Sequence, residues 1–184
     1  MDLRITSVIE EQMSVHFTGK LNILSNFNRQ YLGHLTFLSG EVVKANYQGQ
    51  KGPKAFFQIV LQEFSLNSFT YVVEPEVVDE ADRDIVVPYI LLKEQMADVV
   101  KSYRDSLKMR PPENVKILLE PAFLSDKTSL TPQEYSVLLT LTEWNSPFDI
   151  YQHCPLLDHE ITWALVGLRK KQALKIMGSR NKHE

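Results

Sequence analysis

The sequence of 184 residues has a single cysteine, seven glycines and no long hydrophobic run. Because Cys154 stands alone, an internal disulfide is excluded and a reducing compartment is favoured. No stretch approaches the roughly eighteen consecutive apolar residues of a membrane-spanning helix. Residues 1–13 contain acidic side chains and lack the apolar core of a secretion signal. We therefore expect a cytoplasmic protein without a membrane span.

An excess of one charge is also absent. The formal net charge is −3 at pH 7, which predicts no attraction of the whole chain to nucleic acid or to an anionic membrane. The sequence lacks a nucleophile elbow or a similar catalytic motif, so we expect a protein that is not an enzyme and has no cofactor. A hydrophobic content of 43% is ordinary for a folded protein with one sizeable core or two small ones.

Alternating apolar residues predict a β-sheet in the first part of the chain. Period-two spacing puts such residues on one face of a strand. Ser39 and Gly40 supply a turn, because glycine adopts positive φ at little steric cost. We expect three antiparallel strands joined by hairpins, and a fourth strand after a helix: residues 15–24, 31–38, 41–46 and 68–74.

Helical spacing of apolar residues predicts an opening helix, a long central helix and a group of three helices near the end. The first two are expected at 3–13 and 88–107. Thr131, Pro132 and Glu134 form a helix N-terminal signature. The core side of that helix is expected to hold the following residues: Tyr135, Leu138, Leu139 and Leu141. Three helices followed by a strand at 174–177 outline a helix-turn-helix or winged-helix unit.

The fold class is therefore expected to be α+β, with an antiparallel sheet and packed helices, a linking helix and a small winged-helix-like unit. Residues 74–84 contain six acidic residues and one basic residue, which favours a solvated linker at a domain boundary. These acids lack the glycine and the terminal glutamate of a calcium-binding loop. We expect a first domain at 1–78, a linker and connecting helix at 79–129, and a helical domain at 130–184.

Motifs in the sheet region carry a family resemblance. The chain contains GHLTF at 33–37, SGEVVKA at 39–45 and the pattern G-x-x-G-x-x-A at 49–55. In this order they resemble the PatA N-terminal-like domain, a bacterial family of uncharacterised molecular function. The resemblance implies an α+β domain in cytoplasmic signalling proteins, some of them linked to motility or cell patterning, and it implies no catalytic residues. The family's glycines fall at these positions: Gly19, Gly33, Gly40, Gly49 and Gly52.

The leading hypothesis is a signalling adaptor that binds a partner protein or a second copy of the chain. An apolar stripe on the helix at 88–107 is the candidate contact surface: Leu92, Met96, Val99 and Tyr103. The same stripe can instead pack within the monomer, as most amphipathic stripes do.

The alternative hypothesis is a transcription regulator. Residues 169–184 hold six basic residues and one acidic residue, as phosphate contacts require. The candidate nucleic-acid contacts are Arg169, Lys170, Lys171 and Lys175. Asp158 and Glu160 argue against DNA binding, because they open the helix that would face the phosphates.

Two further sites are weaker. His153, Cys154, Asp158 and His159 supply metal-ligand types, but there is no second cluster at a zinc spacing, so no metal is expected. Lys51 and Lys54 lie where a glycine-containing loop enters a helix, and free N–H groups there can hold an anion such as a nucleotide phosphate. This loop is not a P-loop, because the Gly-Lys-Ser/Thr ending is missing.

Overall fold

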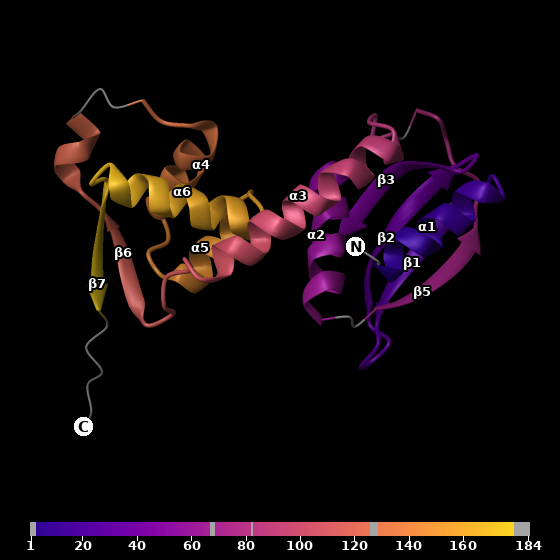
Figure 1. The fold of residues 1–184 in the computed structure, drawn as a ribbon, viewed down its shortest axis with the longest axis horizontal. Helices are drawn as coiled ribbons and strands as arrows, with labels where there is room; N and C mark the ends of the chain where they lie inside the picture. Colours follow the sequence, from indigo (N-terminus) through magenta and orange to yellow (C-terminus); the bar gives the residue numbers. More distant parts are fainter. Residues whose placement is uncertain (1–2, 67–68, 82, 126–128, 179–184) are drawn as a thin grey trace. The chain divides into compact units, whose positions relative to one another are not determined.

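The computed structural model describes residues 3–66, 69–81, 83–125 and 129–178 (Figure 1). The chain forms two compact units, Met1–Lys101 and Ser102–Glu184. The division falls within helix α3 (Tyr89–Leu107), and not in the acidic segment where composition placed the boundary. The end of that segment is held to the sheet, because the backbone N–H groups of Asp84 and Ile85 both donate to the carbonyl of Val43, at 3.1 and 3.0 Å.

The first unit contains the predicted antiparallel sheet. Its strand order is β4 (Gln50–Lys51), β3 (Glu41–Tyr47), β2 (Tyr31–Leu38), β1 (Gly19–Ser25) and β5 (Phe69–Pro75). All neighbouring strands run antiparallel, which confirms the α+β class.

Strand β4 was not expected. It follows a two-residue turn in which Gln48 and Gly49 both have positive φ, at 48° and 84°. Such turns match the twist of the flanking strands, so β3 folds back into a short hairpin. Gly40 also has a positive φ of 85°, as the sequence predicted for the turn between β2 and β3.

Helices α1 (Arg4–Ser14) and α2 (Gly52–Leu66) cover one face of this sheet (Figure 1). The core between the helices and the sheet includes the following side chains, which are at most 1% exposed: Ile5, Ile9, Leu21, Ile23, Leu35, Phe37, Ala45, Phe56 and Ile59. The alternate strand residues point to the other face, since successive side chains of a strand face opposite ways. That outer face carries polar side chains such as Lys20, Asn22 and His34, together with apolar ones such as Leu24 and Val72.

The second unit combines three helices with a two-stranded antiparallel sheet. The helices are α4 (Pro132–Leu141), α5 (Pro147–His153) and α6 (Asp158–Lys170). Strand β6 (Val115–Leu119) pairs with β7 (Leu174–Gly178), and the 3-10 turn η1 (Pro121–Ser125) follows β6. The sequence left the type of the 115–119 run open, because its partner strand lies far along the chain. The winged-helix interpretation of this unit stays a prediction.

Helix α4 begins as its sequence predicts. Thr131 Oγ1 accepts from the Glu134 N–H at 3.2 Å, and Glu134 Oε2 accepts from the Thr131 N–H at 2.8 Å. The predicted core side of α4 was partly wrong, because Tyr135 and Leu139 are 56% and 53% exposed. These two residues form a stripe of their own, whereas Val137, Leu138 and Leu141 face the core.

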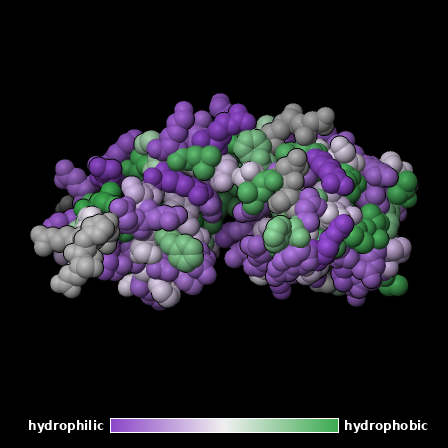
Figure 2. All heavy atoms as spheres, turned by 90° about the horizontal axis from the view of Figure 1, so that it is seen from below, coloured by the Kyte–Doolittle hydropathy of each residue, from purple (hydrophilic) through white to green (hydrophobic). Residues whose placement is uncertain are grey.

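The surface is mainly hydrophilic on the face shown in Figure 2, where hydrophobic residues form small separate patches. Among the helices that the structure describes, none is long and apolar enough to cross a membrane.

Candidate functional site

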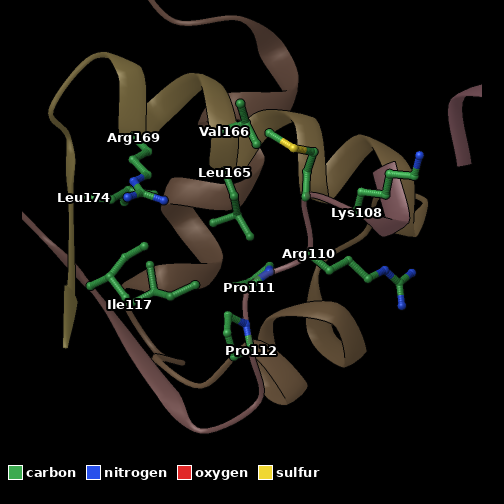
Figure 3. Close-up of a pocket in the computed structure, with 11 residues that line it drawn as sticks. Lys108, Arg110, Pro111, Pro112, Ile117, Leu165, Val166, Arg169 and Leu174 are labelled. Atoms are coloured by element: carbon green, nitrogen blue, oxygen red, sulfur yellow. The ribbon is translucent and has the colours of Figure 1, made fainter. Parts of the chain in front are cut away.

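A groove in the second unit is lined mainly by apolar residues. It has a volume of about 280 Å³ and lies between α6, the β6–β7 sheet and residues 109–112. Leu165 of α6, Ile117 of β6 and Leu174 of β7 point into it from three sides (Figure 3). Pro111 and Pro112 line another side of the groove. These two prolines cannot continue helix α3, and their segment also serves as a wall of the groove.

The charges at this groove have one sign. The described lining residues include Lys108, Arg110 and Arg169 but no acidic side chain. In Figure 3 the guanidinium of Arg169 lies beside Leu174, whereas the side chains of Arg110 and Lys108 extend away from the cavity. Arg169 is exposed and has no ion-pair partner in the described part of the chain. It is therefore the cation best placed to meet an anionic group in the groove.

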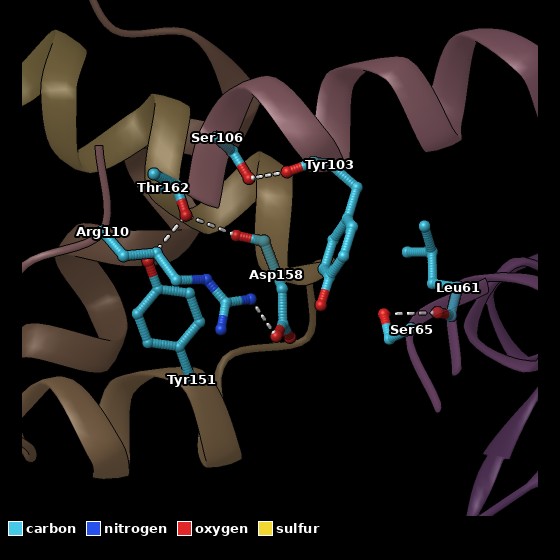
Figure 4. A network of polar contacts seen from close by, with 8 residues as sticks. All are labelled: Leu61, Ser65, Tyr103, Ser106, Arg110, Tyr151, Asp158 and Thr162. Atoms are coloured by element: carbon cyan, nitrogen blue, oxygen red, sulfur yellow. Dashed lines mark hydrogen bonds and ion pairs between the residues drawn. The ribbon is translucent and has the colours of Figure 1, made fainter. Parts of the chain in front are cut away.

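Arg110 is fixed by the elements beside the groove (Figure 4). Its guanidinium forms an ion pair with Asp158 at the first turn of α6 and lies over the ring of Tyr151, 4.8 Å from the centroid. The Tyr151 hydroxyl and Thr162 Oγ1 are hydrogen-bonded at 2.6 Å, and burial raises the pKa of Tyr151. Arg110 thus holds the 109–112 segment against α6, so we interpret it as a positioning residue.

Polar contacts tie the first half of α6 to the end of α3 and to the segment that follows it. Trp163 Nε1 donates to Ser102 Oγ at 3.2 Å, and Arg110 pairs with Asp158 one turn earlier. A helix that enters the major groove of DNA needs a free outer face. Insertion of α6 into DNA would therefore require these contacts to open.

The predicted basic residues have different roles. Arg169, Lys170 and Lys175 are exposed, whereas Lys171 donates from Nζ to Glu134 Oε2 at 2.6 Å and to the Ser129 carbonyl at 2.8 Å. Burial would raise the pKa of Glu134, but the hydrogen bonds from Lys171 and Thr131 outweigh it, and the pKa lies below its ordinary value. Lys171 is thus part of the fold. The basic residues of 179–184 lie outside the described residues.

The apolar stripe predicted on α3 is only partly accessible. Leu92 and Met96 are 1% and 4% exposed, and Val99 and Tyr103 are half-buried. The exposed apolar residues of the same helix include Ile90, at 59%. A partner could therefore reach Leu92 and Met96 only if the surrounding packing opened.

The two lysines of the predicted anion loop separate. Lys51 lies on β4 and lines a cavity on the outer face of the sheet. Lys54 lies in the first turn of α2 and is not among the residues that line that cavity.

The predicted metal-ligand types do not converge. His153 stacks on Trp144 with ring centroids 4.3 Å apart, and Asp158 is engaged by Arg110. Cys154 and His159 are buried, and burial lowers the pKa of His159. Across the described ranges, no group of three or more His, Cys, Asp or Glu residues could hold a metal ion.

The acids of 74–84 are also dispersed. Glu76 Oε2 pairs with Lys20 Nζ at 2.6 Å, and Glu74 accepts from Asn22 Nδ2 at 2.8 Å. Asp84 accepts from the backbone N–H of Ala45 at 3.2 Å. Because these three carboxylates each have a partner on the sheet, they tie the segment to the first unit and do not converge on one point.

Comparisons of this chain with protein-family models, with curated proteins and with solved structures gave no match. The resemblance to the PatA N-terminal-like domain therefore stays a prediction, and function is argued from the geometry. No sequence motif marks the groove, because its walls come from α6, β6, β7 and residues 109–112. The one local signal was the Arg110-Pro111-Pro112 run.

Proposed function

We propose that the chain is a non-enzymatic interaction module whose second unit binds an acidic, apolar peptide segment of a partner protein. The observation that carries this proposal is an apolar groove with a basic edge and no acidic lining residue among those described. Apolar anchors supply most of the affinity at such surfaces, and complementary charge supplies orientation and specificity.

The size of the groove favours a peptide side chain as the occupant. At about 280 Å³ it lies at the lower limit of small-molecule pockets, which start near 300 Å³. A single Leu or Phe anchor buried beside Leu165 would contribute roughly 1.5–3 kcal/mol. An acidic residue next to that anchor would reach Arg169, which needs no rearrangement because it is already exposed.

The test compares two short labelled peptides that share the same Leu and Phe positions and carry either Glu or Lys between them. We expect the acidic peptide to bind the full chain at physiological salt, as measured by fluorescence anisotropy. Arg169→Glu should weaken that binding about tenfold, or ~1.4 kcal/mol, and should favour the basic peptide instead.

The control is Lys116→Glu, which makes the same charge change on the opposite face of the β6–β7 sheet. Lys116 is exposed and does not line the groove. Equal binding of both peptides, or equal losses for the two variants, would contradict the proposal.

DNA binding by the basic end of the same unit is the second candidate. It is favoured by the exposure of Arg169, Lys170 and Lys175. The contacts of Trp163 and Asp158 on α6 and the acidic residues of its first turn weigh against it. Titration with mixed-sequence duplex DNA separates the two candidates: binding that persists at physiological salt and is lost in Lys170→Gln/Lys175→Gln would establish DNA as the ligand.

The family resemblance supplies a setting for the leading proposal. A signalling adaptor in the bacterial cytoplasm would use such a groove to bring a partner to the first unit. The resemblance names no partner. The proposal therefore describes the bound segment only by its acidic and apolar residues, and the peptide experiment tests that description.

A further inference from the structure

The outer face of the five-stranded sheet carries polar side chains in rows that cross the strands. The register places Lys20 opposite Thr36, and Thr36 opposite Lys44. Because neighbouring strands lie roughly 4.8 Å apart, the backbones of the two lysines are about 10 Å from each other, with Thr36 between them. The next row on the same face includes Asn22, His34, Asn46 and Lys51.

A cavity of about 400 Å³ lies over these rows. The sheet forms one side of it, and residues 76–79 form another. Lys20, Lys44 and Lys51 line the cavity, together with Glu76 and Asp79. Glu76 is the partner of Lys20, at 2.6 Å. The volume lies within the usual range of small-ligand pockets, and basic lining residues outnumber acidic ones.

The hydroxyl of Thr36 gives a second, independent indication that this cavity binds a ligand. Thr36 lines the cavity and is only 4% exposed, yet its hydroxyl is buried and has no hydrogen-bond partner among the described residues. Buried hydroxyl groups in folded proteins are normally paired, and exceptions call for an explanation. A hydroxyl whose two cross-strand neighbours are lysines is a donor placed where an anion would be attracted.

His34 belongs to the same environment. Burial lowers its pKa, and the charges of Lys20 and Lys44 lower it further, against weaker opposing effects of Glu76 and Asp84. Its Nδ1 is hydrogen-bonded to the hydroxyl of Tyr31. The ring is thus held beside two cations, and a bound anion would reverse the effect of those cations on it.

We propose that this cavity binds the phosphate group of a small phosphorylated metabolite, between Lys20 and Lys44 and above Thr36. A phosphate accepts from the threonine hydroxyl and from both ammonium groups, and its double negative charge suits a site with three lysines. Lys51 borders the cavity on β4 and contacts the rest of the ligand. Glu76 competes with the phosphate for Lys20 and has to release it on binding.

The first experiment titrates the ¹⁵N-labelled full chain with inorganic phosphate, adenosine 5′-monophosphate and adenosine, at constant ionic strength, with sodium chloride as the control. We expect inorganic phosphate or the monophosphate to shift the amide signals of Thr36 and its row and to raise the pKa of His34. Tighter binding of the monophosphate would identify a phosphate ester as the ligand, and tighter binding of inorganic phosphate would identify free phosphate. No shift, equal shifts with adenosine, or equal shifts with chloride would overturn the proposal.

The second experiment uses variants with opposite expected effects. Lys44→Met should weaken phosphate binding tenfold or more, and Glu76→Gln should strengthen it several-fold because the competitor is removed. The matched controls are Lys54→Met and Glu11→Gln, which lie on α2 and α1 outside the cavity and should leave the affinity unchanged.

Circular dichroism checks that each variant folds. If Lys44→Met does not fold, Lys51→Met on the short edge strand β4 replaces it. Weaker binding in Glu76→Gln, or equal losses in Lys54→Met and the cavity lysine variant, would contradict the site.

Discussion

The carboxylate of Glu63 in α2 accepts a hydrogen bond of 3.0 Å from the backbone N–H of Ile5 in the first turn of α1. The residue before that helix, Leu3, provides no side-chain cap. Glu63 therefore satisfies from a second helix a donor that Ser or Asp would normally satisfy locally. Its other oxygen accepts from the Tyr71 hydroxyl at 2.7 Å, so one buried residue joins α1, α2 and β5.

Replacing Glu63 by leucine is expected to lower the free energy of unfolding by roughly 2–4 kcal/mol, because two buried donors lose their partner. Urea unfolding followed by circular dichroism measures the loss. Gln62→Leu changes an exposed neighbour on the same helix and should cost much less. Similar losses in both variants would show that the Ile5 and Tyr71 hydrogen bonds contribute little.

The pair of Lys171 and Glu134 predicts a dependence of stability on pH. The pKa of Glu134 is lower in the folded chain than its ordinary value of 4.5, so its contribution is present above about pH 4.5 and is lost as the pH falls through the folded pKa. Lys171→Met should cost roughly 1.5–3 kcal/mol at pH 7 and should flatten the acid limb of the stability curve. Lys170→Met, at an exposed position, serves as the control; an unchanged acid limb in Lys171→Met would contradict the assignment.

Arg110 and Arg169 are expected to respond differently to the same substitution. Arg110→Lys keeps the charge but loses the planar group that lies over Tyr151. The free energy of unfolding, evaluated at the midpoint of thermal unfolding, should therefore fall by about 1 kcal/mol. Arg169→Lys should leave stability unchanged and weaken the acidic peptide only slightly, because a cation remains. A large loss of stability in Arg169→Lys would show that this residue is structural.

The stripe on α3 can be tested by placing a carboxylate at a buried and at an exposed position. Met96→Glu should destabilise the chain by ~3 kcal/mol or more, because it puts an unpaired charge at a site that is 4% exposed. Ile90→Glu, at a site that is 59% exposed, should be tolerated. Equal stability of both variants, measured by chemical denaturation, would mean that Met96 is free to meet a partner.

Local signals account for the parts of the fold that could be predicted. The alternation in β1, β2 and β3 and the turn at Gly40 depend on neighbouring residues, and the structure confirms them. The capping box at Thr131 and Glu134 is equally local. The two residues of β4 are too few to show a period, and β6 depends on a partner more than fifty residues away.

The candidate sites were harder to predict, because they depend on how distant residues meet. The row Lys20–Thr36–Lys44 follows from the register of two hairpins, each with an irregularity that no composition signal marks. Among the predicted basic residues, Lys171 forms an ion pair with Glu134, and no feature of the sequence indicates that contact. The core side of α4 was misjudged because Tyr135 and Leu139 are apolar but lie on a separate stripe.

The measurement that tests the proposed function most directly is a chemical-shift map of the ¹⁵N-labelled full chain with the acidic peptide. The account predicts that the largest changes fall on the groove: residues 109–112, 165–169 and 174–176. Changes centred on the exposed face of α4, or on the sheet of the first unit, would contradict it, because the peptide would then bind without the groove.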